Sequence, residues 1–113
     1  MELTNPINIS VSIIIVNYRT PSLTLACIDS IYAHTKGVDF EVIVVDNHSE
    51  DDSVERLSKD NRIILIESLR NGGFGYGNNL GMKVARGKYF FLLNSDTLLV
   101  NNAIKEFYDY AES

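Results

Sequence analysis

Residues 11–21 read Val-Ser-Ile-Ile-Ile-Val-Asn-Tyr-Arg-Thr-Pro, and this stretch decides the fold. Its first six residues form an almost continuous β-branched run, which is typical of a strand buried on both faces of a parallel sheet. Thr20 followed by Pro21 predicts a helix start, because threonine can cap a helix and proline suits its first position. The stretch therefore predicts a strand that passes directly into a helix.

The same strand-then-helix unit recurs along the rest of the chain. Apolar runs predict three further strands, at residues 41–45, 62–67 and 89–93. Apolar residues at helical spacing follow each of them, and the last amphipathic segment spans 103–110. This β-α-β-α-β-α-β-α order predicts an α/β fold with a mostly parallel sheet and helices on both faces, because each crossover must be right-handed.

Two helix boundaries carry local signals of their own. Ser49 is predicted to cap the second helix, and the acidic residues 50–52 would favour the positive end of its dipole. Arg86 and Gly87 are predicted to end the third helix, as a C-terminal cation followed by a glycine just beyond the last turn.

The bulk composition describes one acidic, globular domain. The chain has 113 residues, of which 45% are hydrophobic, and this is enough for a single core. Its net charge of −5 argues against binding to nucleic acid, which needs clustered lysine and arginine. Residues 1–10 are polar and mixed, so we expect a loose lead-in followed by one unit over 11–113.

The chain is expected to be cytoplasmic. Cys27 is the single cysteine, so no internal disulfide can form, which fits a reducing compartment. No signal peptide is recognisable, and the first apolar run, residues 11–16, is too short to span a bilayer. Membrane association is therefore expected only through parts of a full-length protein that lie outside this chain.

The unusual polar and glycine residues of the chain follow the predicted strands. Open α/β sheets bind ligands outside the carboxyl ends of their strands, and that rule selects four segments: 17–19, 46–49, 71–79 and 94–96. Asp46 could accept a hydrogen bond from a ligand base or ribose, or could order its own turn. Tyr18 could stack on a base or could pack against the protein.

Four glycines fall within residues 72–77, just before the third predicted helix. Glycine lets the backbone approach a ligand, and a helix N-terminus favours an anion such as a diphosphate. The spacing Gly73-x-Gly75-x-Gly77 is neither the G-x-G-x-x-G dinucleotide fingerprint nor a Walker A motif. The segment is therefore a candidate phosphate loop, with a merely flexible loop as the alternative.

Residues 94–96, Asn-Ser-Asp, place one carboxylate at the end of the fourth predicted strand. A hard divalent cation prefers such an oxygen, completed by waters and substrate phosphates. Asp96 is a stronger metal-binding candidate than an ordinary turn residue, because Asp46 ends a neighbouring strand on the same rim. Zinc is not expected, because His34 and His48 are far apart in the pattern and belong to no cluster of cysteine or glutamate.

These segments together resemble the family 2 glycosyltransferases of the GT-A fold. Residues 12–18 resemble the family's first strand and its nucleotide-contacting turn, and residues 44–51 resemble its Val-Val-Asp-Asn-x-Ser-x-Asp motif. Residues 71–81 resemble the Asn-x-Gly-Phe-Gly-x-Gly-Asn-Asn-x-Gly segment of the rhamnosyltransferase-like branch. Residues 85–97 resemble the approach to the family's D-x-D position, and the resemblance covers 11–105 in total.

The resemblance implies the Rossmann-like, nucleotide-sugar-binding half of a GT-A domain that transfers a sugar, with inversion, to an acceptor hydroxyl. The implied nucleotide-binding residues are Asn17, Tyr18, Asp46, Asn47, Gly73, Asn78 and Asn94. Asn17 and Tyr18 would line the nucleoside pocket, and Asp46 would contact the base. Asn78 and the glycine-rich segment would border the ribose and diphosphate. Asp96, the second acid of D-x-D, would hold Mg²⁺ or Mn²⁺ as a Lewis acid for the leaving nucleoside diphosphate.

The sequence departs from the family pattern in two respects. Asn94 stands in place of the first acid of D-x-D, as in much of the rhamnosyltransferase-like branch, and this lowers the charge available to a metal. The resemblance also implies a longer catalytic domain, whose later half holds the catalytic base and the acceptor site. This chain is therefore expected to bind a donor without turning it over.

The expected partners are a UDP- or dTDP-sugar donor and, in a full-length protein, a glycan or lipid-linked acceptor of cell-surface polysaccharide synthesis. Without later strands the fourth strand would lie at or near an open sheet edge, so a homo-oligomer formed through this edge is also expected. The alternative function is a non-catalytic nucleotide-binding or interaction module. A receiver-type domain is disfavoured, because it needs acidic residues where 17–19 reads Asn-Tyr-Arg.

Overall fold

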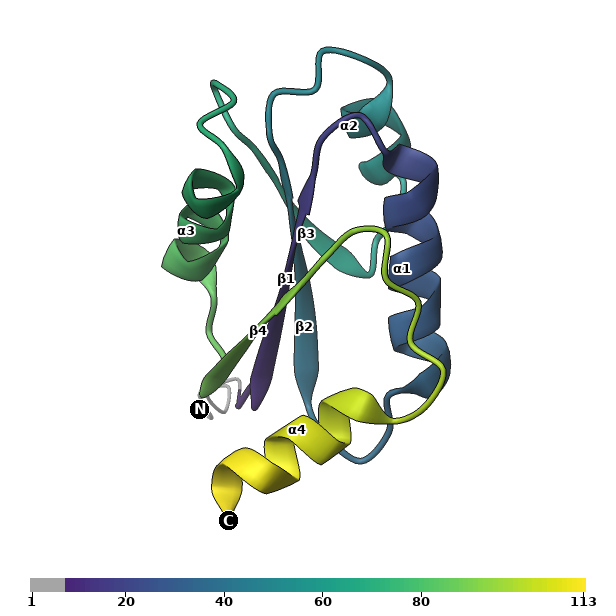
Figure 1. Ribbon diagram of the computed structural model, residues 1–113, viewed down its shortest axis with the longest axis vertical. Helices are drawn as coiled ribbons and strands as arrows, with labels where there is room; N and C mark the ends of the chain where they lie inside the picture. Colours follow the sequence, from purple (N-terminus) through teal and green to yellow (C-terminus); the bar gives the residue numbers. More distant parts are fainter. Residues whose placement is uncertain (1–7) are drawn as a thin grey trace, which may run out of the picture.

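The computed structural model describes residues 8–113, so the first seven residues of the predicted lead-in lie outside the described residues. Four strands alternate with four helices along the chain (Figure 1). In chain order they are β1 (Val11–Asn17), α1 (Pro21–His34), β2 (Phe40–Asp46), α2 (Ser53–Leu57), β3 (Ile63–Glu67), α3 (Phe74–Val84), β4 (Tyr89–Leu93) and α4 (Ala103–Glu112). Within residues 8–113 we find no helix with the length and apolar character that crossing a membrane requires.

The four strands form one sheet in the order β3-β2-β1-β4, and each neighbouring pair is parallel. The register pairs Asn17 with Asp46 across the carboxyl ends of β1 and β2, and Ile15 with Leu93 on the other side of β1. This arrangement confirms the predicted α/β fold with a parallel sheet. It also brings the polar segments that follow the strands to one rim.

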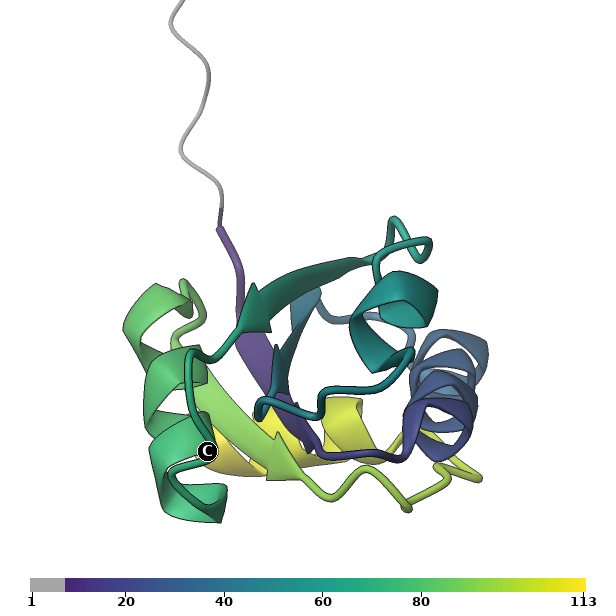
Figure 2. The same ribbon diagram turned by 90° about the horizontal axis from the view of Figure 1, so that it is seen from above.

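Helices cover both faces of the sheet, as predicted, but they do so unequally (Figures 1 and 2). Helices α1, α2 and α4 lie on one face, and α3 lies alone on the other. The larger core lies on the first face and is built from buried aliphatic side chains: Val11, Ile13, Ile15, Ile28, Ile31, Val42, Val44, Leu57 and Ile104. The β-branched strands therefore face helices on both sides, which accounts for their continuous apolar sequence.

The glycines of the glycine-rich segment do not all belong to a loop. Helix α3 begins at Phe74, so Gly75 and Gly77 lie in its first turns. A Cβ at Gly77 would lie 3.0 Å from the Val16 side chain, and one at Gly81 would lie 2.6 Å from Ile14 Cγ2. Two of the α3 glycines therefore let the helix approach the sheet closely. This packing role was not predicted from the sequence.

Both predicted helix-boundary signals have other roles. Helix α2 begins at Ser53 with Asp52 at the capping position, whereas Ser49 is buried and bonded to Asp46. The prediction that Ser49 caps the helix is therefore wrong, because Asp46 binds the hydroxyl that would have capped it.

The end of α3 was predicted to within two residues of Arg86, since the helix ends at Val84, but Gly87 does not cap it, because Ala85 is already extended. Gly87 instead allows a close backbone crossing, since a Cβ there would lie 2.5 Å from the Ser12 nitrogen. By contrast, the predicted start of α1 is confirmed, with Thr20 at the capping position and Pro21 as the first helical residue.

Glu41 in β2 joins three elements through one buried carboxylate. Its Oε2 accepts hydrogen bonds from Ser12 Oγ at 2.6 Å and from the Arg86 backbone nitrogen at 2.7 Å. Its Oε1 accepts from Arg86 Nε and Nη2 at 3.0 and 2.9 Å. Burial alone would raise the pKa of Glu41, but these hydrogen bonds and the arginine charge outweigh it and hold the pKa below its ordinary value.

Candidate functional site

The strand order places a topological switch point between β1 and β4. The chain runs from β1 outward to β2 and β3 on one side and returns to β4 on the other. In open α/β sheets the ligand crevice lies at the carboxyl ends of the strands that flank such a point. A hollow of about 310 Å³ is found there, lined by Thr20, Leu23, Phe74, Asn94, Ser95 and Asp96.

This hollow brings together two of the segments that the sequence singled out, 71–79 and 94–96, with the start of α1. Thr20 follows β1, residues 94–96 follow β4, and Phe74 is the first residue of α3. The hydroxyls of Thr20 and Ser95 lie 3.4 Å apart and link the start of α1 to residues 94–96. The two predicted residues Asn94 and Asp96 both face the hollow and are both exposed, so a ligand could reach them.

Asp96 is the one ionisable side chain among the residues that line the hollow. Within residues 8–113 there is no group of three or more histidine, cysteine or acidic side chains that could hold a metal by themselves. A single carboxylate beside neutral oxygens suits a divalent cation whose remaining ligands are phosphate oxygens and water. The residues therefore fit a metal that arrives with a diphosphate and do not form a closed protein site.

Asn17 and Asp46 form the centre of a buried polar network at the ends of β1 and β2. The Asn17 amide nitrogen donates to Asp46 Oδ1 at 2.9 Å, and its oxygen accepts from Thr24 Oγ1 at 2.6 Å. Ser49 donates to both Asp46 oxygens, from its hydroxyl at 2.6 Å and from its backbone nitrogen at 3.1 Å. Asp46 is only 3% exposed. In this structure its carboxylate orders its own turn, which was one of the two roles considered for it.

Asn47, the next residue, has a buried side-chain oxygen whose hydrogen-bonding capacity is unused among residues 8–113. The residue is only 4% exposed. Its Nδ2 donates a hydrogen bond to Asn71 Oδ1 at 2.9 Å and another to the Gly73 carbonyl at 3.3 Å. Its Oδ1 has no hydrogen-bond partner among residues 8–113. A buried acceptor left in this state costs about 1–3 kcal/mol.

The orientation of this amide follows from its neighbours. Asn71 Oδ1 accepts a hydrogen bond from the Gly73 backbone nitrogen at 2.9 Å, which identifies that atom as an oxygen. Turning the Asn47 amide over would set its oxygen against two acceptors, the Asn71 oxygen and the Gly73 carbonyl. The Asn47 oxygen, and not its nitrogen, is therefore the atom left without a partner among residues 8–113.

Tyr18 and Arg19 occupy the turn directly after β1. The Tyr18 residue is 41% exposed, and the Arg19 guanidinium carbon lies 5.1 Å from the centroid of its ring. Arg19 has a left-handed backbone with φ of 58°, and His48 and Glu50, after β2, have φ of 62° and 59°. Non-glycine residues in this region carry strain that tends to cluster at functional sites. All three lie at the rim that the sequence predicted to hold the ligand.

The glycine-rich segment contributes the N-terminus of α3 to the same rim. Gly73 precedes the helix with φ of 91°, a conformation that glycine adopts easily. The first backbone N–H groups of a helix favour an anion at this point. Asn78, predicted to border the ribose and diphosphate, lies in the second turn of α3 and is half-buried.

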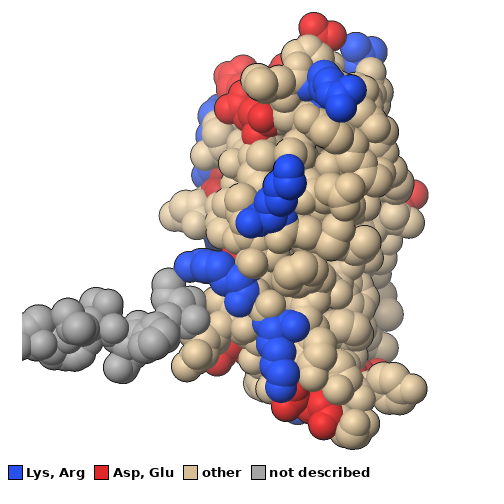
Figure 3. Space-filling view, turned by 90° about the vertical axis from the view of Figure 1, so that its left-hand side faces the viewer, with Lys and Arg blue, Asp and Glu red and all other residues tan. Residues whose placement is uncertain are grey.

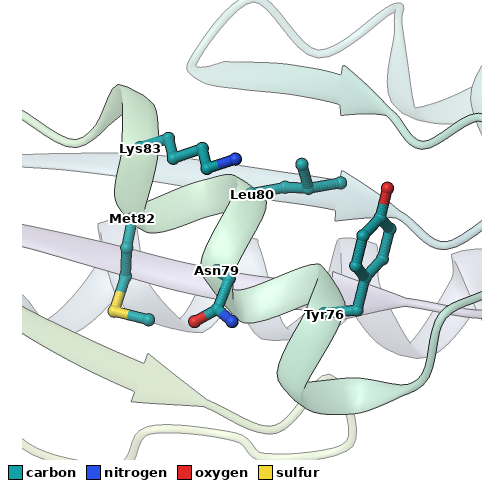
Figure 4. A pocket seen from close by; sticks show the side chains of 5 residues that line it. All are labelled: Tyr76, Asn79, Leu80, Met82 and Lys83. Carbon is teal, nitrogen blue, oxygen red and sulfur yellow. The ribbon is translucent and has the colours of Figure 1, made fainter.

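A larger hollow of about 390 Å³ lies along α3 and is lined by Tyr76, Asn79, Leu80, Met82 and Lys83 (Figure 4). None of these five side chains is a carboxylate, and none follows a strand end. Lysine and arginine side chains form a column on the face that carries α3 (Figure 3). Two exposed basic residues of this region, Arg86 and Lys88, are paired with Glu41 and Glu112.

Residues 12–113 match the glycosyl transferase family 2 profile. The chain belongs to glycosyl transferase family 2. The match includes all eight elements of the fold and every residue of the rim described above. The predicted family is thus confirmed, whereas the comparisons give no specific support for its rhamnosyltransferase-like branch.

Several curated members of family 2 resemble this chain over most of its length. A poly(ribitol-phosphate) beta-glucosyltransferase of Bacillus spizizenii is 29% identical, over 90% of this chain and 17% of that protein. The Staphylococcus aureus poly(ribitol-phosphate) beta-N-acetylglucosaminyltransferase TarP is 28% identical, over 90% of this chain and 33% of that protein. The Escherichia coli UDP-Glc:alpha-D-GlcNAc-diphosphoundecaprenol beta-1,3-glucosyltransferase WfaP is 31% identical, over 91% and 41%. The chain therefore spans less than half the length of these relatives.

Solved structures of family 2 enzymes share the fold. S. aureus TarS 1–349 in complex with UDP-GlcNAc superimposes with a TM-score of 0.77 and 25% identity, over 92% of this chain and 31% of that one. The mannosyltransferase PcManGT of Pyrobaculum calidifontis, in complex with GDP-Man and Mn²⁺, gives 0.75 and 23%, over 85% and 30%. The four-stranded sheet and its helices thus correspond to the N-terminal part of a GT-A domain.

Proposed function

We propose that this chain is the donor-binding part of an inverting glycosyltransferase that uses a UDP- or dTDP-sugar in cell-surface polysaccharide synthesis. The observation that carries the proposal is the buried oxygen of Asn47 at the end of β2, which has no partner among residues 8–113 and lies one strand away from the hollow that contains Asp96. A hydrogen-bond acceptor for the base and a carboxylate for a metal-bound diphosphate thus lie on the same rim of the sheet. The names of the relatives, which include glucosyl- and N-acetylglucosaminyltransferases, support the same class of donor.

We propose uracil or thymine as the base, because each carries a hydrogen on the ring nitrogen N3 that could be donated to Asn47 Oδ1. Cytosine carries no hydrogen on N3, whereas guanine carries an equivalent hydrogen on N1, so GDP is the second comparison in the binding test. The exposed ring of Tyr18 would stack on the base from the neighbouring strand end. Asn17 and Asp46 would act indirectly, because their hydrogen bonds hold the two turns that carry Tyr18 and Asn47.

The diphosphate would lie between the N-terminus of α3 and Asp96. The first N–H groups of α3, after Gly73, would donate to phosphate oxygens, and Asn94 could donate from its amide. A bound Mg²⁺ or Mn²⁺ would supply Lewis acidity to the leaving nucleoside diphosphate. Asp96 would hold that ion, and the Mn²⁺ complex of PcManGT shows that a protein of the same fold binds one.

In the proposed reaction an acceptor hydroxyl oxygen forms a bond to the anomeric carbon of the donor sugar. The bond from that carbon to the diphosphate breaks on the opposite side, so the configuration inverts. The hydroxyl proton must go to a base, and the lining residues of the hollow offer no carboxylate besides Asp96. We therefore propose that this chain binds its donor, while turnover and the glycan or lipid-linked acceptor belong to a full-length enzyme.

Two further properties belong to this proposal. The free and buried Cys27 fits a cytoplasmic location, and the diphosphoundecaprenol acceptor in the name of WfaP fits membrane association of a full-length enzyme.

Strand β4 lies at the sheet edge with Phe90 and Leu92 half-exposed, so two copies could pair there. Light scattering at high concentration should give a dimer that Leu92→Lys converts to a monomer; a wild-type monomer would exclude this pairing.

Binding of nucleotides tests the donor site. Thermal shifts are measured with UDP, dTDP, CDP and GDP and their sugars, each with and without Mn²⁺. A ligand at about twenty times its dissociation constant stabilises a protein by about 1.8 kcal/mol, which is several degrees for a domain of this size. We expect shifts with UDP or dTDP that need Mn²⁺ and disappear in Asp96→Ala, and none with CDP.

Two asparagine variants make the test specific to the base. Asn47→Leu removes the acceptor and should abolish the shift, whereas Asn101→Leu changes an exposed asparagine away from the rim and should retain it. A larger shift with dTDP than with UDP would place the chain in the rhamnosyltransferase-like branch. Equal shifts with CDP and UDP, on a folded protein, would overturn the assignment of Asn47.

A further inference from the structure

Arg19 holds an uncommon backbone conformation at the rim. Its φ of 58° lies in the left-handed region, which arginine rarely adopts and which costs free energy. Two hydrogen bonds to Ser49 maintain this conformation: the Arg19 backbone nitrogen donates to Ser49 Oγ at 2.9 Å, and Nε donates to the Ser49 carbonyl at 2.9 Å. Strain of this kind persists where the surroundings fix the backbone in several ways at once.

Ser49 is a rigid anchor for these bonds. The residue is fully buried, and its hydroxyl and backbone nitrogen both donate to the Asp46 carboxylate. The Asn17 amide donates weakly to the same hydroxyl at 3.4 Å. Arg19 is therefore tied to the turn after β2, although it follows β1 in the chain.

The free part of the Arg19 guanidinium lies over Tyr18. Nε donates to the Ser49 carbonyl, and the central carbon of the guanidinium lies over the Tyr18 ring, 5.1 Å from its centre. A guanidinium at this distance attracts the face of an aromatic ring. One face of Tyr18 is thus covered, although the residue remains 41% exposed.

We infer that Arg19 is a positioning residue: it fixes the Tyr18 ring as a preformed platform for the base, and Ser49 transmits that constraint from the turn that carries Asn47. The inference rests on the proposed function, because it needs a base to stack on Tyr18. A fixed aromatic ring loses less conformational entropy on binding than a mobile one, so the platform raises affinity without a contact from Arg19 to the ligand.

The test uses substitutions that keep the backbone and remove the guanidinium. Asparagine and glycine both tolerate the left-handed region, so Arg19→Asn and Arg19→Gly should fold with unchanged or higher thermal stability. Calorimetric titration with UDP and Mn²⁺ should show binding weakened by about two- to fivefold in both variants. Affinity equal to that of the wild type would overturn the inference.

A double-mutant cycle separates positioning from direct contact. Tyr18→Ala should weaken UDP binding, and Arg19→Asn should have no further effect in that background, because Arg19 acts through Tyr18. The same loss in both backgrounds would mean that Arg19 contacts the nucleotide itself, which overturns the positioning role.

A ligand-free measurement keeps this inference distinct from the proposed function. With 3-fluorotyrosine incorporated, the ¹⁹F signal of Tyr18, assigned from Tyr18→Phe, should shift and broaden in Arg19→Asn without any nucleotide. An unchanged signal would show that Arg19 does not fix the ring. A changed signal in a protein that binds no nucleotide would overturn the donor site, and with it the role of the platform, while leaving the Arg19–Tyr18 contact established.

Discussion

Glu41→Gln should lower the free energy of unfolding by about 2 kcal/mol at pH 7. The Glu41 carboxylate accepts one hydrogen bond from Ser12 and three from Arg86. Glutamine keeps one oxygen and turns an NH₂ group toward donors, so it loses the acceptor for two of these bonds. Hydrogen bonds to charged groups contribute about 1.5–3 kcal/mol each, but the Arg86 side chain is 47% exposed and can rehydrate, which reduces the loss.

The effect should depend on pH in a definite direction. The pKa of Glu41 is lower in the folded chain than its ordinary value, so ionised Glu41 stabilises the fold above the unfolded-state pKa of about 4.3. This contribution is lost as the pH falls through the lower, folded-state pKa. The difference between wild type and Glu41→Gln should therefore be full at pH 7 and should narrow below about pH 5.

Thermal unfolding by circular dichroism measures both effects. At about 4 °C per kcal/mol, the variant should melt about 8 °C below the wild type at pH 7. Glu55→Gln is a matched control, because Glu55 is exposed on α2 and its loss should change stability by about 0.5 kcal/mol or less. A difference that stays constant from pH 7 to pH 3, or one no larger than that of the control, would refute this account of Glu41.

Two other predictions concern packing and the thiol. Gly81→Ala should destabilise the fold by about 1–3 kcal/mol, because its methyl group would lie 2.6 Å from Ile14 Cγ2. Gly75→Ala should be neutral or stabilising by up to ~1 kcal/mol, because no atom of residues 8–113 lies within 4 Å of the added carbon. Urea unfolding of both variants measures this difference in stability. Burial and, to a smaller extent, the charge of Asp96 raise the pKa of Cys27 to about 11, so a thiol reagent at pH 8 should label the folded chain far more slowly than the urea-unfolded chain. Equal labelling rates would show that the thiol is accessible.

The order of strands and helices was predictable because its signals are local. Four β-branched or apolar runs predicted β1 to β4, and their observed bounds differ by only a residue or two. Thr20-Pro21 marked the start of α1 correctly. Ser49 gave a wrong helix start, because its hydroxyl is bound to Asp46. The end of α3 lies two residues before Arg86, although Gly87 bonds to Ser12 and does not cap the helix.

The residues of the candidate site were predictable as a set but not in their individual roles. Sequence position alone put Asn94, Asp96 and the start of α3 on one rim, and the hollow between β1 and β4 contains residues from each of these segments. The family resemblance implied that Asp46 contacts the base, whereas we propose this role for Asn47. The proposal depends on which oxygen is already satisfied, and Asn71, 24 residues further along the chain, accepts from Asn47 Nδ2 and thereby fixes which side-chain atom of Asn47 remains unpaired.

The sequence by itself determined the alternation of elements, the family and the rim at which a ligand should bind, because apolar runs, caps and strand ends are properties of neighbouring residues. Only the tertiary structure decided that the Asp46 carboxylate is bonded within its own turn, that Asn47 Oδ1 has no partner among residues 8–113, and that Arg19 lies over Tyr18. These facts depend on hydrogen bonds and on side-chain directions where separate strands and turns meet, and the spacing of residues along the chain contains no information about them.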